Sequence, residues 1–294
     1  MIMKRERGFM RFMKGMICLT ALTIAAGFLY GEAALPIMTA AWKGDTAEVR
    51  KLLEEGADIN TSDRGFTPLL VALQGGHLET AKFLIEKGAN VKAVTPDGRS
   101  TMAFAANGGY KEICKMLLDR GVDSNVSTSS GTTPLILASV MNRTDVVELL
   151  LDNGAKRDTV DKKGRNALME ASFYGNSDIV IIFIKRGSDV NAKDKNGGTP
   201  LIFATVRDHR KTMEALLNAG ADVNLADNEG RTPLMIAAAK GFSEAVRILI
   251  EKGADIRRKS KWGETAIDVA KTTKHPELVL QLEAWSKKAT EKTP

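Results

Sequence analysis

A short, mostly apolar run recurs along this chain, introduced by a polar residue in many copies and closed in most of them by glycine. In "TPLMIAAAKG", residues 232–241, Thr232 has the side chain of a helix N-cap. Pro233 suits the first turn of a helix, where its missing N–H has no partner to lose. The run ends at Gly241, so the segment predicts a short helix.

An amphipathic run follows directly. In "FSEAVRILIEKG", residues 242–253, Val246, Leu249 and Ile250 share one face of a predicted second helix. Gly253 supplies the left-handed residue after that helix. The next stretch, "ADIRRKSKWGE", has the length and glycine placement of an extended, hairpin-like loop.

This unit is repeated at a fixed interval. The glycine before the apolar run recurs every 33 residues, at Gly65, Gly98, Gly131, Gly164, Gly197, Gly230 and Gly263. The glycine after the second helix recurs at Gly56, Gly88, Gly121, Gly154, Gly187, Gly220 and Gly253, with one step of 32. Seven linkers imply about eight units, the first beginning near Ala34. A single unit cannot bury its apolar face alone, so the sequence predicts a stacked array.

The repeat resembles the ankyrin repeat over residues 34–285, most of the chain after its N-terminal segment. The matching segments are Thr67-Pro68-Leu69, Thr133-Pro134-Leu135, Thr199-Pro200-Leu201 and Thr232-Pro233-Leu234, with "GADIN", "GANVK", "GSDVN" and "GADVN" at the loop starts. The resemblance implies an all-α solenoid of helix-turn-helix units with protruding hairpin-like loops, capped at both ends. The chain departs from the family at the signature histidine, which no unit has, and at Ser100-Thr101 and Asn166-Ala167, which replace Thr-Pro.

The N-terminal segment has a different composition. Lys4, Arg5, Arg7, Arg11 and Lys14 precede an uncharged run over 15–31, and small residues follow before Ala34. This order is typical of an export signal, so we expect residues 1–33 to be removed and 34–294 to form the array. The uncharged run of 17 residues is at the lower limit for crossing a bilayer, so an uncleaved membrane anchor is the alternative.

Export changes how the charge and the cysteines are interpreted. The chain has 42 basic and 36 acidic residues; without residues 1–33 it has 37 and 34, a net charge of +3. So weak a charge gives no general reason to expect nucleic-acid binding. Of the two cysteines, Cys18 would be lost with the signal, and Cys114 falls on the apolar face of a second helix, as a core thiol.

The candidate catalytic and metal-binding residues all fall on framework positions. His77, His209 and His275 are separated by 132 and 66 residues, which are whole numbers of repeats, so stacking keeps them apart. Asp161, Asp194 and Asp227 share one loop register in which an alcohol stands in other units, as expected of turn residues. The sequence therefore predicts no enzyme, no metal site and no cofactor.

Residues that differ between units are the candidates for partner binding. In the ankyrin family, partners contact the loop tips and the exposed side of the first helix. Carried over by register, this predicts that Val140, Met141, Phe173 and Tyr174 form an exposed apolar patch on the concave face. The other candidates near the turn between the helices are Trp42, Arg207 and Lys240.

The last loop carries a second candidate site. Arg257, Arg258, Lys261 and Trp262 are crowded together there and would attract an acidic protein surface. We therefore expect a non-enzymatic protein-binding module, exported and most simply periplasmic in a bacterium. The alternatives are a membrane-anchored scaffold or stability factor for an envelope enzyme, with membrane contact through residues 15–31, and an exported effector that binds a protein in another cell.

Overall fold

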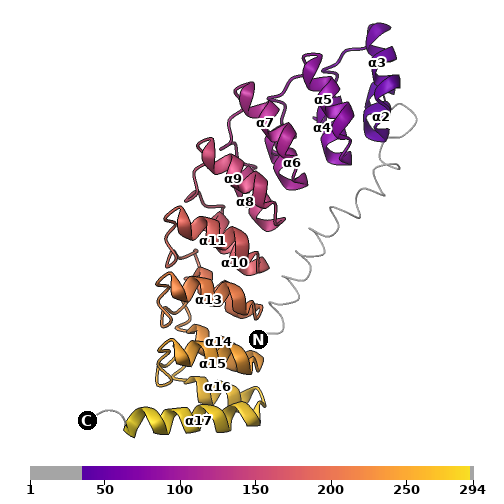
Figure 1. Ribbon diagram of the computed structural model, residues 1–294. Coiled ribbons are helices and arrows are strands. Elements are labelled where there is room, and N and C mark those ends of the chain that lie inside the picture. Colours follow the sequence, from indigo (N-terminus) through magenta and orange to yellow (C-terminus); the bar gives the residue numbers. More distant parts are fainter. Residues whose placement is uncertain (1–34, 292–294) are drawn as a thin grey trace. The chain divides into compact units, whose positions relative to one another are not determined.

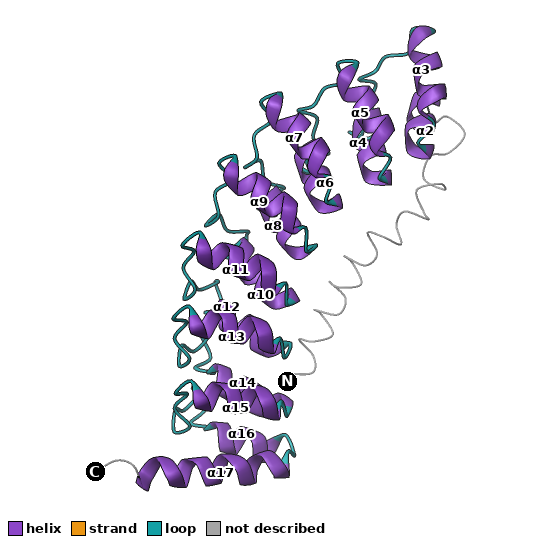
Figure 2. Ribbon diagram, in the orientation of Figure 1, coloured by secondary structure: helices purple, strands orange, loops and turns teal. Residues whose placement is uncertain are grey.

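The computed structural model describes residues 35–291 of this 294-residue chain. Within that range the chain is all-helical, with sixteen helices in a repeating helix-turn-helix arrangement and no strand (Figure 2). The predicted export segment, residues 1–33, lies outside the described residues. Among the described helices, none combines the length and the apolar character needed to cross a bilayer.

The helices, most of which are labelled in Figure 1, divide between two compact units, one ending at Pro96 and one beginning at Asp97. The first unit holds α2 (Pro36–Lys43), α3 (Thr46–Glu54), α4 (Pro68–Gly75) and α5 (Leu78–Glu86). The second unit holds α6 (Thr101–Gly108), α7 (Lys111–Asp119), α8 (Pro134–Val140), α9 (Thr144–Asp152), α10 (Ala167–Tyr174), α11 (Ser177–Lys185), α12 (Pro200–Val206), α13 (Arg210–Asn218), α14 (Pro233–Lys240), α15 (Ser243–Glu251), α16 (Ala266–Thr272) and α17 (Pro276–Glu291).

The predicted start and stop of the first helix are confirmed. The Thr232 hydroxyl accepts a hydrogen bond from the Met235 amide at 3.3 Å, and Gly241 ends α14 in the left-handed conformation. Where the chain departs from Thr-Pro, Ser100 and Asn166 accept the corresponding bond at 3.1 and 2.9 Å. These departures keep the N-cap, because serine and asparagine side chains also offer a well-placed oxygen.

The core of the second unit consists of columns of equivalent residues from successive repeats. Small side chains let the first helices approach closely, and all are fully buried: Ala105, Ala138, Ala171, Ala204, Ala237 and Ala270. The second helices contribute Cys114, Val147, Val180, Met213 and Val246, all fully buried as well. The core position predicted for Cys114 is confirmed, and burial raises the pKa of its thiol to about 12. Such a thiol is chemically inert near neutral pH.

At the start of three second helices, a side chain reaches back to the preceding repeat. Nε2–H of His209 donates to the Phe173 carbonyl at 3.1 Å, and Nδ2 of Asn176 donates to the Ser139 carbonyl at 2.6 Å. In the same register, Nε of Arg143 donates to the Asn107 carbonyl at 3.2 Å. These bonds satisfy carbonyls at the C-terminal end of a helix, which otherwise lack partners. The framework role predicted for the histidines is thus confirmed at His209.

The loop tips of the second unit are linked by main-chain hydrogen bonds between repeats. The amide of Lys195 donates to the Lys163 carbonyl at 3.0 Å, and that of Asn228 donates to the Asn196 carbonyl at 2.9 Å. The same bond recurs at Ser129, Lys162 and Lys261. One such bond per repeat holds each tip against its neighbour, so the tips form a fixed row.

An asparagine ladder runs beside this row at the start of each loop. Oδ1 of Asn191 accepts from the Asp222 amide at 2.9 Å, and its Nδ2 donates to the Gly220 carbonyl at 3.4 Å. Asn125 and Asn224 bridge to the next repeat in the same way. In the repeat between those of Asn125 and Asn191, the equivalent residue is Asp158. Its carboxylate has no N–H to donate to the glycine carbonyl of the next repeat, and it pairs instead with Arg157 at 3.4 Å.

We expect Asp158→Asn to raise the free energy of unfolding by about 1 kcal/mol, because it restores an amide bridge between two repeats. The exposed pair with Arg157 contributes little, so its loss offsets only part of the gain. Chemical denaturation followed by circular dichroism measures the change. The matched control is Asn191→Asp, which should lower stability by a similar amount. A stability unchanged by both substitutions would show that the ladder does not hold the repeats together.

Candidate protein-binding surface

The candidate residues near the ends of the first helices differ in exposure. Arg207 and Lys240 are exposed, whereas Val140, Met141 and Tyr174 are half-buried. Trp42, also half-buried, lies in the last turn of α2 in the first unit. Packing of α8 against α10, and of α10 against α12, brings four of these positions into one region: Met141, Tyr174, Arg207 and Val140.

Phe173 does not lie on the exposed side of its helix as predicted. Its side chain is only 6% exposed. Its ring meets the Phe203 ring edge-on at 6.2 Å and the Tyr174 ring at 5.2 Å, and the Arg207 guanidinium covers it at 4.7 Å from the ring centre. The prediction was wrong because these neighbours, two of them from the next repeat, turn the ring into the contact between α10 and α12. Phe173 therefore lies beneath the candidate surface and packs against Tyr174 and Arg207, which are part of it.

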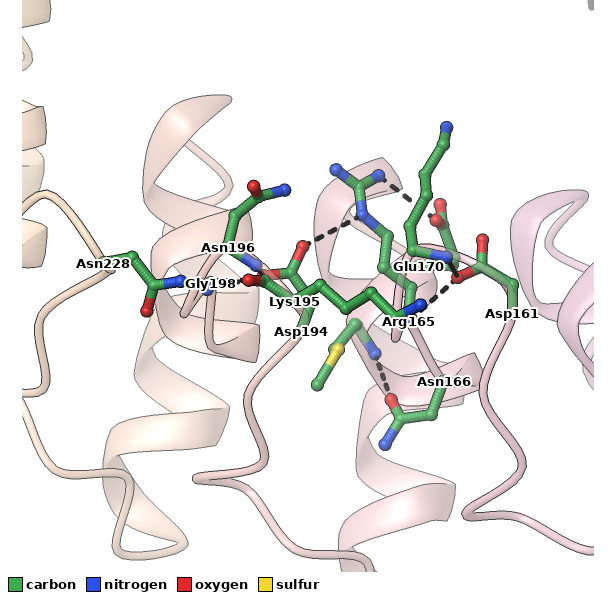
Figure 3. Close-up of polar contacts among 11 residues, drawn as sticks. Asp161, Arg165, Asn166, Glu170, Asp194, Lys195, Asn196, Gly198 and Asn228 are labelled. Atoms are coloured by element: carbon green, nitrogen blue, oxygen red, sulfur yellow. Dashed lines mark hydrogen bonds and ion pairs between the residues drawn. The ribbon is translucent and has the colours of Figure 1, made fainter.

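An ion cluster around Arg165 lies beside this aromatic group; Figure 3 shows the cluster. Nη1 of Arg165 is 3.3 Å from Oε1 of Glu170, and its Nε is 3.4 Å from Oδ2 of Asp194. The Asp194 side chain is 2% exposed and that of Arg165 16%. The guanidinium also stacks on the Phe203 ring, 4.6 Å from its centre. One arginine therefore joins the loop before α10, the helix α10 itself and the next loop.

The loop aspartates turn inward and bond to their own backbone, as predicted for turn residues. Oδ1 of Asp161 accepts from the amides of Lys163 and Arg165 at 2.8 and 2.9 Å. Oδ1 of Asp194 accepts from the amides of Asn196 and Gly198 at 2.9 and 2.7 Å (Figure 3). Each carboxylate fixes the turn that follows it and is therefore occupied within the loop.

Sequence reasoning missed the cluster of Arg165 with Glu170 and Asp194. The sequence did contain an indication of it, because Glu170 is a charged residue at a position that is apolar in the other repeats of the second compact unit. The residues at that position in those repeats are Phe104, Leu137, Phe203, Ile236 and Val269. A charged residue in an otherwise apolar register needs a partner when it is buried. Only the fold shows that this partner is Arg165.

We expect Arg165→Ala to lower the free energy of unfolding by about 3 kcal/mol at neutral pH, because it leaves two buried carboxylates without their cation. Burial raises the pKa of Glu170, and the Arg165 guanidinium opposes that rise. Without Arg165 the folded-state pKa rises further above its unfolded value. As pH increases, ionisation of Glu170 therefore lowers the free energy of unfolding of the variant more than that of the wild-type chain. The difference in stability between the two chains should be smaller at pH 4 than at pH 7.

Denaturation at the two pH values measures this deficit. Arg99→Ala is the matched control: Arg99 stacks on Phe104 at 5.0 Å but pairs with Asp97, whose side chain is 52% exposed. A loss for Arg165→Ala no larger than the control loss, and the same at both pH values, would contradict a buried ion cluster.

The last loop presents the second group of candidate residues, which we call the basic tip: Arg257, Arg258, Lys261 and Trp262. All four are exposed, Trp262 at 61%. The tip is nevertheless held in place, because the Lys261 amide donates to the Glu229 carbonyl at 3.0 Å. An exposed tryptophan on a fixed, cationic loop has the character of an interface anchor. The basic tip stands two repeats beyond Arg207, so the structure does not bring the two groups of candidates together.

Comparison with known families identifies the repeat. Models described as "Ankyrin repeats (3 copies)" match residues 18–95, 37–129, 91–161 and 153–227, and one described as "Ankyrin repeats (many copies)" matches 216–270. These matches cover most of the chain, which belongs to the ankyrin-repeat family. Repeats of this family are generally protein-interaction modules without enzymatic activity.

Two known proteins illustrate how far the similarity extends. The chain is 37% identical over 70 residues to "Palmitoyltransferase AKR1" of Lachancea kluyveri, which is 24% of this chain and 10% of that protein. It is also 37% identical over 70 residues to "Ankyrin repeat and SAM domain-containing protein 6" of Rattus norvegicus, which is 23% of this chain and 8% of that protein. The chain thus spans about a tenth of these relatives, and the similarity to the palmitoyltransferase covers only repeats.

Proposed function

We propose that this ankyrin array binds a partner protein through the ends of its first helices and its loop tips. The observation that carries the proposal is the contrast between constant and variable positions. Caps, glycines and alanine columns recur from repeat to repeat, whereas the last residues of the first helices change from Val140 and Met141 to Tyr174, Arg207 and Lys240. Invariant residues build the scaffold, so the variable ones are free to encode a partner.

The basic tip extends this surface. Its three exposed cations would attract an acidic region of the partner and raise the rate of encounter. Trp262 would then be buried on binding, which is a usual role of tryptophan at interfaces.

The proposed location is the cell envelope of a bacterium, with about eight repeats in the periplasm after residues 1–33 are removed. The basic residues before an uncharged run of 17 support export. The same run supports the alternative, an array tethered to the inner membrane as a scaffold for an envelope enzyme. An exported effector that acts in another cell is a further alternative with the same signal.

Mass spectrometry of the chain expressed in a Gram-negative host tests the location. A mass that begins near Ala34 in the periplasmic fraction supports removal of the signal. An intact chain in the membrane fraction would favour the tethered scaffold. An intact chain in the cytosol would rule out export.

Affinity capture from envelope extract tests the binding surface. The wild-type chain should retain a partner that is lost from a Met141→Ser, Tyr174→Ser, Arg207→Ser variant that remains folded. The variant Arg257→Ser, Arg258→Ser should slow association and weaken its dependence on salt. A partner bound equally by all three chains would mean that the contact surface is elsewhere.

A further inference from the structure

We infer that the surface over α10 and α12 accepts an extended acidic segment of the partner, which also carries an apolar side chain. The inference rests on the proposed function and specifies the chemistry of its ligand. We call this the α10–α12 surface and define it as Met141, Tyr174 and Arg207 with the two loops 161–165 and 193–198.

The charges of these loops are arranged in two layers. Their aspartates and Glu170 are held inside, by backbone amides and by Arg165, as described above (Figure 3). The lysines, in contrast, are exposed: Lys162, Lys163, Lys193 and Lys195. Among the described residues, no carboxylate forms an ion pair with Lys162 or Lys195. A ligand that approaches these loops therefore meets positive charge, with the negative charge neutralised beneath it.

The opposite end of α10 and α12 adds an apolar contact and another cation. Tyr174 and Met141 are half-buried, and Arg207 is exposed with its guanidinium stacked on Phe173. An arginine held against an aromatic ring is already oriented, so its side chain loses little further conformational freedom when a carboxylate binds it. A partner side chain seated on Tyr174 would be apolar or aromatic, because such pairs remove the most apolar surface from water.

Spacing of the lysines defines the segment more closely. Lys162 and Lys195 are equivalent residues in neighbouring repeats, and their loops are joined by the bond from the Lys195 amide to the Lys163 carbonyl. Packed helices stand about 8–10 Å apart. An extended chain advances about 3.3 Å per residue, so carboxylates about three residues apart would meet both lysines. The row of main-chain bonds keeps this spacing fixed before the ligand arrives.

Selection of random 12-residue peptides on the full chain tests the inference without a bias toward acidity. We expect the selected peptides to be enriched in Asp and Glu about three residues apart, together with an apolar residue outside this pair. Fluorescence anisotropy then measures a selected peptide against Lys162→Glu, Lys195→Glu, which should weaken binding about tenfold. The matched control, Lys115→Glu with Lys211→Glu, has the same net charge and places both changes on second helices; its affinity should remain within about twofold.

The possible results distinguish failure of the acidic ligand from failure of the proposed function. Thermal melts first verify that both charge-reversed chains are folded; these four lysines are exposed, so no loss is expected. Selected peptides without acidic enrichment, or with equal affinity for the two charge-reversed chains, would overturn the acidic ligand. If those peptides still depend on Tyr174 and Arg207, the proposed function stands. If no selected peptide depends on any of these positions, both are overturned.

Discussion

Gly197→Ala should lower the free energy of unfolding by about 3 kcal/mol, because it combines backbone strain with a collision between repeats. Gly197 has a φ of +76°, in the left-handed region. A Cβ added there would lie 2.6 Å from the backbone nitrogen of Asn228. That nitrogen donates the bond to the Asn196 carbonyl that joins two loop tips, so neither side can move without breaking it. Denaturant titration followed by circular dichroism measures the loss.

Gly220→Ala is the matched control for strain alone. Gly220 follows α13 with a φ of +89°, which confirms the left-handed conformation predicted from its register. An added Cβ meets nothing within 4 Å. The expected loss is therefore the left-handed penalty, about 1–2 kcal/mol, and Gly220→Val should cost a similar amount. Equal losses for Gly197→Ala and Gly220→Ala would show that the loop-to-loop contact adds nothing to the stability of the array.

The sequence predicted the framework well because each framework signal acts locally. A threonine, serine or asparagine before the first helix caps it through its own side chain, whichever of the three is present. A glycine after the second helix supplies a conformation that depends on one residue. Even the histidine register was predictable, because the 33-residue period shows that His209 occupies a position equivalent to His77. Repetition of a local signal removes most of the ambiguity that a single copy would have.

The candidate surface was less predictable because it depends on contacts between repeats. The register placed Phe173 correctly at the end of α10, but the direction of its ring is set by Phe203 and Arg207 of the next repeat. The apolar patch predicted from four side chains is therefore three half-buried residues above a buried ring. Likewise, nothing in the sequence indicated that the fold would hold Arg165, largely buried, between two carboxylates. The 33-residue period shows which positions are equivalent, but it does not show which contacts form between residues that differ from one repeat to the next.

Phe173→Ala and Tyr174→Ala should therefore separate stability from binding, although the two residues are adjacent. Phe173 is 6% exposed and contacts two rings and a guanidinium. Removing its ring leaves a cavity between α10 and α12 and should lower the free energy of unfolding by about 3 kcal/mol or more. Tyr174 is half-buried, so its truncation should cost about 1 kcal/mol. Denaturation of the two variants in parallel gives both values.

For affinity to the partner, we expect the truncation of Tyr174 to matter directly, whereas Phe173 should act only through folding. Tyr174→Ala removes a side chain that the proposed partner would cover, so the complex should weaken by about 2 kcal/mol, or roughly thirtyfold, in a chain that remains folded. Phe173→Leu serves as the control, because it keeps most of the buried volume and thus the position of Arg207 above it. That variant should remain folded and bind the partner with nearly unchanged affinity. A Phe173→Ala chain as stable as wild type would contradict the buried ring. A Tyr174→Ala chain that binds as tightly as wild type would remove Tyr174 from the contact surface and leave the charged residues of the α10–α12 surface to hold the partner without it.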